Sequence, residues 1–311
     1  MAGVPCLLGT DTFTGWTPKT DATVITRILD NGGTITGKAV CENLSRGAVS
    51  STAASGPVDN PFCAGYSAGG SSSGTAALVA SGAVDMGIGC DQGGSIRIPA
   101  ALCGLVGLKA TTGLVPYTGI ASNDASVDYV GPITRTALDA AMLLECIAGV
   151  DGVDDRQIAG VPFPKDVPKY SQILESMDMS KEYPLEGVKL GILKEGIEHT
   201  NTHPGVRDKF LAAVEVFKTL GAEVSEVSVP LHTPARTIYT VLSKMSNHRG
   251  MLGQAVGRRG VMLTDLLEKK GLPYTQEVID KVSFHSSRLS QYNAFPLHAH
   301  ETAEPRMQDL I

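Results

Sequence analysis

Two glycine-rich serine segments constrain this chain more than any other feature of its sequence. The first is GGSSSG, residues 69–74, and the second is DQGGSIR, residues 91–97. An apolar stretch between them is long enough for one helix and one strand. Glycine loops expose backbone N–H groups and let a substrate approach the chain closely. A serine that ends such a loop can therefore be a nucleophile with oxyanion donors beside it.

Residues 65–116 resemble the amidase signature family, the serine hydrolases with a Ser–cis-Ser–Lys triad. Both loops, their order and the 24 positions between Ser71 and Ser95 agree with the family pattern. The Asp-Gln-Gly-Gly-Ser sequence of the second loop resembles that of the family branch that includes amidases acting on simple aliphatic and aryl amides. The looser resemblance covers residues 1–285 as one partial domain and leaves 286–311 as a divergent tail. It implies an α/β fold with a single mixed β-sheet core flanked by helices on both faces, here incomplete.

The resemblance also assigns roles to residues of the two loops. Ser95 becomes the nucleophile that forms the acyl-enzyme, and Ser71, which follows a cis peptide bond, relays the proton. The other implied roles are the oxyanion hole, from the N–H groups of Gln92, Gly93, Gly94 and Ser95, and loop support, from Asp91, Arg97 and Ser72. The implied activity is hydrolysis of a carboxamide C–N bond to acid plus ammonia or amine, with no metal or cofactor.

The triad lysine of the family is expected a few residues before Met1 and is therefore absent from this sequence. Such a lysine must be neutral to accept a proton, and burial lowers its pKa. Either Met1 is an internal start of a longer protein, or the chain is a truncated, inactive homologue that only binds. Lys38 and Lys109 are the nearest lysines that could substitute, and both are also ordinary surface or strand-end residues.

Composition narrows the classes of partner. The net charge of −6 provides no basic field for nucleic acid. The sequence contains no run of 18 or more apolar residues of the kind that would predict a membrane span. Six scattered cysteines without a C-x-x-C pair indicate reduced thiols in the cytoplasm rather than a zinc cluster. We expect a small-molecule amide as the partner, with a homodimer left open.

Periodicity and breakers place the elements along the chain. A helix is predicted over 21–29, capped by Asp21, then a strand over 34–37. A helix over 75–81 and a strand over 85–89 lie between the serine loops, and a further helix covers 137–149. Residues 151–187 are expected to form a long loop. A β-α-β unit follows, with strands at 188–193 and 223–229 and a helix at 204–220, and residues 235–283 are mainly helical.

Several alternatives remain open at this point. Gly65–Gly69 matches the G-x-S-x-G elbow of α/β-hydrolases, but residues 60–63 do not indicate the strand that should precede it. Residues 32–39 nearly match a P-loop, yet Ala39 replaces the required Ser or Thr. The two loops could also bind a phosphate without chemistry. Tyr117 and Tyr129 could line an acyl pocket or pack in the core. The tRNA-dependent amidotransferase branch of the family is disfavoured by Gln92.

Overall fold

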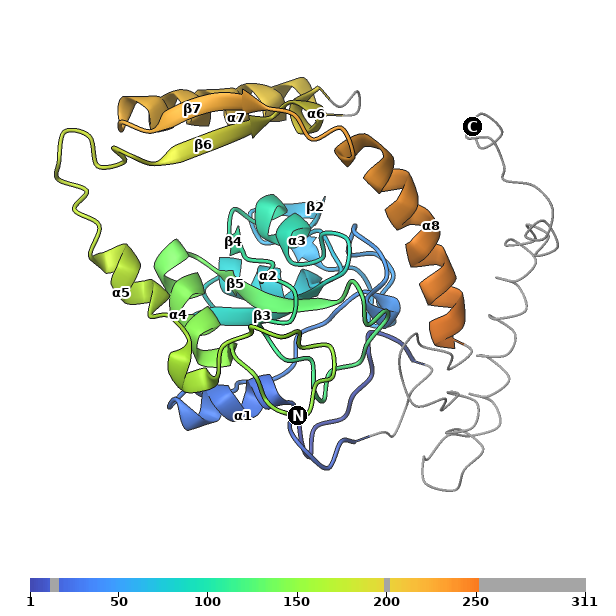
Figure 1. The fold of residues 1–311 in the computed structure, drawn as a ribbon. Coiled ribbons are helices and arrows are strands. Elements are labelled where there is room, and N and C mark those ends of the chain that lie inside the picture. The colour runs from blue at the N-terminus through green and yellow to red at the C-terminus, as the bar shows by residue number, and fades with distance from the viewer. Residues whose placement is uncertain (12–16, 199–201, 252–311) are drawn as a thin grey trace, which may run out of the picture.

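The computed structural model describes residues 1–11, 17–198 and 202–251. Its centre is a three-stranded antiparallel sheet in the order β3-β5-β4 (Figure 1). The strands are β3 (Met86–Asp91), β4 (Val106–Gly107) and β5 (Tyr129–Thr134), and the helices packed on them are α1 (Thr23–Asp30), α2 (Ser73–Ala80), α3 (Arg97–Leu102) and α4 (Ala137–Ile147). None of the helices in these ranges has the length and hydrophobicity to cross a bilayer.

Successive side chains of β3 and β5 point to opposite faces of the sheet, and this alternation divides the hydrophobic core into two clusters. Val130 packs in one cluster with residues of α1 and α4, and Ile133 packs in the other with residues of α2 and α3. The two residues have opposite parity in one strand, so their side chains point to opposite faces. The helices therefore cover both faces of the central sheet.

The glycines of β3 explain how closely α2 lies against this strand. A Cβ added at Gly87 would stand 2.3 Å from Cγ2 of Thr75, and one at Gly89 would stand 2.8 Å from Oγ of Ser72. Met86, Ile88 and Cys90 alternate with these glycines and pack against the opposite cluster. The sequence MGIGCD therefore packs large side chains on one face of β3, and its glycines leave room for the first serine loop and α2 on the other face.

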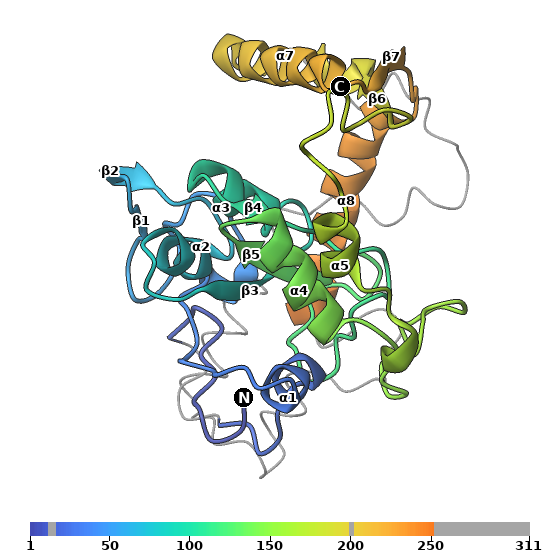
Figure 2. The same cartoon turned by 90° about the vertical axis from the view of Figure 1, so that its left-hand side faces the viewer.

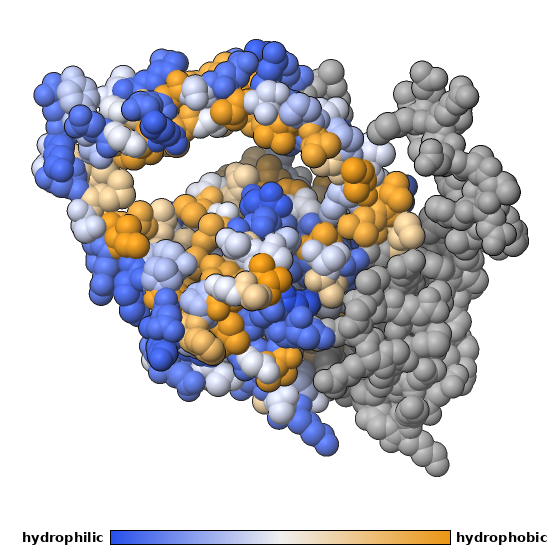
Figure 3. All heavy atoms as spheres, in the orientation of Figure 1, coloured by the Kyte–Doolittle hydropathy of each residue, from blue (hydrophilic) through white to orange (hydrophobic). Residues whose placement is uncertain are grey.

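The predicted β-α-β unit is confirmed. Strands β6 (Lys189–Leu193) and β7 (Glu223–Val227) pair in parallel, with α7 (Pro204–Thr219) between them. This unit stands apart from the central sheet in two perpendicular views (Figures 1 and 2), and the long helix α8 (His232–Met251) runs back from it. A space-filling view shows open space between the unit and the rest of the described chain (Figure 3).

The expectation of a single mixed sheet is wrong for the described residues, whose strands form three separate sheets. The third is a small antiparallel pair of β1 (Asp59–Asn60) and β2 (Cys63–Ser67). Outside a β-α-β unit, strand patterns indicate which segments are extended but not which of them pair. The remaining short elements are η1 (Asn43–Ser45), η2 (Pro164–Asp166), α5 (Tyr170–Glu175) and α6 (Lys194–Ile197).

Other local predictions also need correction. Residues 34–37 form no strand, because no partner strand lies beside them in the described chain. Asp21 does not cap α1: Ala22 is the N-cap residue, and Oδ1 of Asp21 instead accepts from the Ala2 N–H at 2.6 Å. The predicted loop at 151–187 contains α5, which contacts α4. Residues 252–283, predicted to be mainly helical, and the tail at 286–311 lie outside the described residues.

Candidate active site

The first serine loop is buried and leads directly into α2. Ser71, Ser72 and Ser73 are exposed by 2%, 6% and 1%, respectively. The Ser71 carbonyl accepts from the Glu42 N–H at 3.0 Å, and the Gly74 N–H donates to the Val40 carbonyl at 2.9 Å. The peptide bond between Gly70 and Ser71 is cis, as the resemblance implies for Ser71.

The second serine loop is organised by one buried carboxylate, that of Asp91 at the end of β3. It accepts hydrogen bonds from the amides of Gly94 at 2.7 Å and Ile96 at 3.2 Å. Arg97 adds a bidentate pair, with Nε and Nη2 each at 2.9 Å. Burial alone would raise the pKa of Asp91, but these hydrogen bonds outweigh it and lower the pKa. Asp91 and Arg97 therefore lie where a loop-supporting pair was predicted.

One predicted oxyanion donor does not fit this arrangement. The Gly94 N–H points at Asp91 and is already engaged by it. The amides of Gln92, Gly93 and Ser95 have no acceptor among the described residues. Nε2 of Gln92 is likewise buried without a hydrogen-bond partner in the described chain. Of the four predicted donors, the amides of Gln92, Gly93 and Ser95 are thus the ones that no acceptor in the described chain engages.

The two loops meet through Ser72. Its backbone N–H donates to the Ser95 carbonyl at 3.2 Å, and its Oγ lies 3.2 Å from the Cys90 nitrogen and 3.3 Å from the Cys90 oxygen. Gly69 packs against α3, because an added Cβ would stand 2.8 Å from Cα of Pro99. The fold thus holds Ser71 and Ser95 on adjoining, mutually bonded segments.

Neither substitute lysine hydrogen-bonds to Ser71. Lys38 is exposed, and its Nζ lies 3.3 Å from the Val4 carbonyl. Lys109 donates to the Ala110 carbonyl at 3.0 Å, and its Nζ lies 3.7 Å from the centre of the Tyr129 ring. Both ammonium groups have structural partners of their own.

Two residues beside the loops were not predicted. The hydroxyl of Tyr239 on α8 covers Gly93, since an added Cβ there would stand 2.0 Å from Oη. The carboxylate of Glu42 lies behind Gly70, where the corresponding distance to Oε1 is 2.7 Å. Both contacts depend on side chains from distant segments, and no local motif indicates them.

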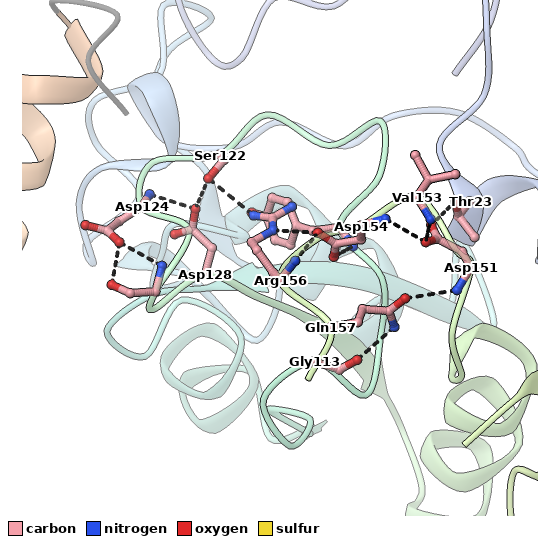
Figure 4. A network of polar contacts seen from close by, with 12 residues as sticks. Thr23, Gly113, Ser122, Asp124, Asp128, Asp151, Val153, Asp154, Arg156 and Gln157 are labelled. Atoms are coloured by element: carbon pink, nitrogen blue, oxygen red, sulfur yellow. Dashed lines mark hydrogen bonds and ion pairs between the residues drawn. The ribbon is translucent and has the colours of Figure 1, made fainter. Parts of the chain in front are cut away.

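Tyr117 and Tyr129 both line a small cavity next to the central sheet. Tyr117 is also part of the core, and Arg156 stacks on its ring with Cζ 4.1 Å from the ring centre. Ser71 and Ser95 are not among the lining residues. Three other residues that line the cavity, Asp128, Asp154 and Arg156, belong to a polar network that continues to α1 (Figure 4). The other side chains of this network include those of Thr23, Ser122, Asp124, Asp151 and Gln157.

The α/β-hydrolase elbow is not supported. Ser67 ends strand β2, contrary to the expectation that no strand precedes it, but α2 begins only at Ser73. Oγ of Ser67 accepts from the Gly69 N–H at 2.9 Å and lies 3.2 Å from Oγ of Ser50. Ser67 is therefore a structural residue of the loop. Among the described residues, no group of three or more His, Cys, Asp or Glu side chains could hold a metal ion.

The two joined serine loops and the cis peptide bond before Ser71 match the pattern of the amidase signature family, and comparison with known proteins gives the same class. The family model described as Amidase matches residues 1–307. The chain belongs to this amidase family.

The relatives are longer than this chain. It is similar to an enantioselective amidase of Rhodococcus rhodochrous, 43% identical over 78% of this chain and 45% of the relative. It is also similar to a glutamyl-tRNA(Gln) amidotransferase subunit of Gloeobacter violaceus, 37% identical over 78% of this chain and 47% of the relative. The X-ray structure of a peptide amidase from Stenotrophomonas maltophilia superposes with a TM-score of 0.70 at 28% identity, covering 91% of this chain and 58% of that one. The chain thus spans about half the length of the curated relatives it matches.

Proposed function

We propose that this protein hydrolyses the C–N bond of a small carboxamide through a seryl acyl-enzyme on Ser95. The observation that carries the proposal is the hydrogen bond between the Ser72 N–H and the Ser95 carbonyl, which joins the two serine loops. The Asp91 clamp supports it further, because it leaves three loop amides without acceptors in the described chain.

In the first half-reaction, Ser71 passes the Ser95 hydroxyl proton to a neutral amine, the lysine that the family resemblance implies. The Ser95 oxygen bonds to the carbonyl carbon, and the carbonyl electrons move onto oxygen. The amides of Gln92, Gly93 and Ser95 donate to this oxyanion. The C–N bond then breaks, and the proton returns through Ser71 to the leaving nitrogen. Water attacks the acyl ester in the second half-reaction and releases the carboxylic acid and free Ser95.

The oxyanion donors are expected to supply much of the acceleration. Loss of one such donor typically costs about 10²–10³ in kcat. Backbone donors held by a rigid clamp need no reorganisation during the reaction. The Asp91–Arg97 pair thus contributes by fixing the loop before substrate arrives.

A small-molecule amide is a better substrate proposal than an amide on charged tRNA. Of the two relatives compared, the enantioselective amidase is more similar to this chain than the amidotransferase component. The net charge of −6 also offers no field for a phosphate backbone.

Covalent labelling with a fluorophosphonate, followed by intact mass spectrometry, tests the proposal. We expect one label per chain, lost in Ser95→Ala and retained in Ser81→Ala, an exposed serine at the end of α2. The assay is run on this chain and, where the open reading frame continues upstream of Met1, on that longer product. Absence of labelling at high reagent excess would overturn the proposal and favour the alternative, an inactive homologue that only binds.

A further inference from the structure

Glu42 carries a carboxylate that is fully buried, with 0% of the residue exposed. No basic side chain pairs with it in the described chain. Four hydrogen-bond donors hold it instead. Oε1 accepts from the amides of Val49 at 2.9 Å and Ser50 at 2.6 Å. Oε2 accepts from the Thr52 amide at 2.8 Å and from the Thr52 hydroxyl.

The loop after Glu42 is shaped around this carboxylate. Its backbone has positive φ at Ser45, Gly47 and Ser50, with values of 56°, 133° and 56°. Such turns aim successive N–H groups at one point and create an anion-binding concavity. Burial would raise the pKa of Glu42, but the four hydrogen bonds outweigh it and lower the pKa, so the group is ionised at neutral pH.

The same residue holds the first serine loop from two sides. Its backbone N–H donates to the Ser71 carbonyl at 3.0 Å. Its carboxylate packs under Gly70, where an added Cβ would stand 2.7 Å from Oε1. The wrapped loop contributes as well, because that Cβ would also stand 3.3 Å from the Ala48 carbonyl carbon. The carboxylate and the wrapped loop therefore fill the space directly beside Gly70, next to Ser71.

We propose that Glu42 is a positioning residue that fixes Ser71 for proton relay, an inference that rests on the function proposed above for Ser71. Glu42 does not touch the reacting atoms. It acts by converting the loop at 45–52 into a rigid support for the serine.

Glu42→Gln is the direct test. Glutamine places an N–H₂ donor where the carboxylate accepted, facing either the Val49 and Ser50 amides or the donors of Thr52. In the fluorophosphonate assay, we expect the maximal labelling rate of Ser95 to fall by about 10²-fold, as for a catalytic group misplaced by an ångström. The half-saturating reagent concentration should stay unchanged, because the reagent's binding contacts are intact.

Glu145→Gln is the matched control. Glu145 on α4 also accepts a backbone hydrogen bond, from the Ser171 N–H, and its side chain is only 13% exposed. Among the described residues it makes no hydrogen bond or ion pair with either serine loop, so its variant should label at the wild-type rate. A Glu42→Gln variant that labels as fast as the control would overturn the proposal.

Two variants of Thr52 keep the proposal testable if Glu42→Gln fails to fold. Thr52 is exposed, and its hydroxyl donates to Glu42. Thr52→Val should lower the maximal labelling rate, and Thr52→Ser, which keeps the hydroxyl, should restore it. Equal rates in the two variants would contradict a role exerted through the carboxylate.

Hydrogen exchange separates this inference from the proposed function. In Thr52→Val, amides of residues 68–74 should exchange faster than in Thr52→Ser, whether or not Ser95 is labelled. If wild-type protein takes no label, the hydrolase proposal fails, and the exchange result alone decides whether Glu42 anchors Ser71. Unchanged exchange in the valine variant would overturn the anchoring.

Discussion

At the residue scale, glycine is required in the first serine loop and in strand β2 just before it, for two separable reasons. Gly65 and Gly69 have almost the same positive φ, 81° and 78°. An added Cβ at Gly65 would meet nothing within 4 Å, whereas one at Gly69 would stand 2.8 Å from Cα of Pro99. Backbone conformation constrains both positions, but only Gly69 is also constrained by packing.

This pair gives a quantitative prediction. Gly65→Ala should lower the free energy of unfolding by about 1–2 kcal/mol, the cost of a left-handed conformation for a residue with a Cβ. Gly69→Ala should lose about 1–3 kcal/mol more, because the first loop and α3 must separate. Urea denaturation of both variants measures the difference. Equal losses would show that the contact with Pro99 is not rigid.

The site could be predicted only where a motif itself contains the residues. Asp91 and Arg97 lie in one short segment, whereas the pairing of Ser71 with Ser95 and the roles of both serines come from the family resemblance and stay predictions. The direction of the Gly94 N–H could not be predicted, because it depends on the conformation of the Asp91 side chain, whose carboxylate accepts this N–H. Glu42 and Tyr239 reach the loops from distant segments, and their types carry no signal by themselves.

At the element scale, the end of α4 is held by a side chain from α1. Nη1 of Arg27 donates to the carbonyls of Ile147 at 2.8 Å, Ala148 at 2.7 Å and Gly149 at 3.0 Å, and Nη2 donates to Val150 at 3.1 Å. These carbonyls lie at and just beyond the C-terminus of α4, where no intrahelical donor remains for them. A cation is also favourable there because of the helix dipole.

We expect Arg27→Met to lower the free energy of unfolding by about 1–3 kcal/mol, since several carbonyls lose a charged donor. Arg27→Lys should recover part of this loss, because an ammonium cannot reach all four carbonyls. Arg207→Met on the exposed face of α7 is the control and should be nearly neutral. Thermal denaturation of the three variants decides the matter, and a neutral Arg27→Met would refute this capping role.

Elements with strong local signals were predicted well, including β6 and β7, whose connecting helix indicates parallel pairing; strands without such a connection to a partner were not. The helix predicted over 137–149 is α4, and its N-terminus is capped by Thr136, whose Oγ1 accepts from the Asp139 N–H at 3.1 Å. The β-branched residues of 34–37 favour a strand, but extended backbone needs a neighbouring strand to complete its hydrogen bonds. The same reason explains why the number of sheets was mispredicted.

At the scale of the whole molecule, burial is uneven. The largest fully buried side chains, including Ile96, Ile133 and Ile147, lie in the central sheet and the segments packed around it. Among the described residues of the β6–α7–β7 unit, Val214 and Ala222 are the buried hydrophobic ones. Several apolar side chains of α7 are exposed: Val206 by 64%, Phe210 by 46% and Phe217 by 42%.

Low burial predicts low local stability. Amides of β6, α7 and β7 should exchange with solvent faster than those of β3 and β5, after correction for intrinsic rates. Hydrogen-exchange mass spectrometry at neutral pH measures this directly. Equal protection of the two groups of strands would mean that the molecule opens as one cooperative unit.

Acid stability should depend on Asp151, which joins α1 to the segment after α4. Its carboxylate accepts from Thr23 Oγ1 and from the amides of Val153 and Asp154. Burial would raise its pKa, but these hydrogen bonds lower it to about 2. The folded-state pKa lies below the unfolded value of about 3.9, so the contribution to stability is present above pH ~4 and is lost as the pH falls toward about 2.

Asp151→Asn should therefore be less stable than wild type at neutral pH, and the difference should shrink as the pH approaches about 2. Asp30→Asn, at the exposed end of α1, is the control for removing a carboxylate outside this network. Denaturant titrations across this range measure both variants. A difference that stays constant with pH would exclude the carboxylate charge as its origin.

The hydrogen bond from Ser72 to Ser95 also bears on when the reactive centre forms. It closes a loop that contains only α2 and β3, and closing so short a loop costs little chain entropy. Once β5 has left the ribosome, both serine loops and all three central strands are available to fold. We therefore expect the paired loops to assemble during synthesis, before β6, α7 and β7 have been translated.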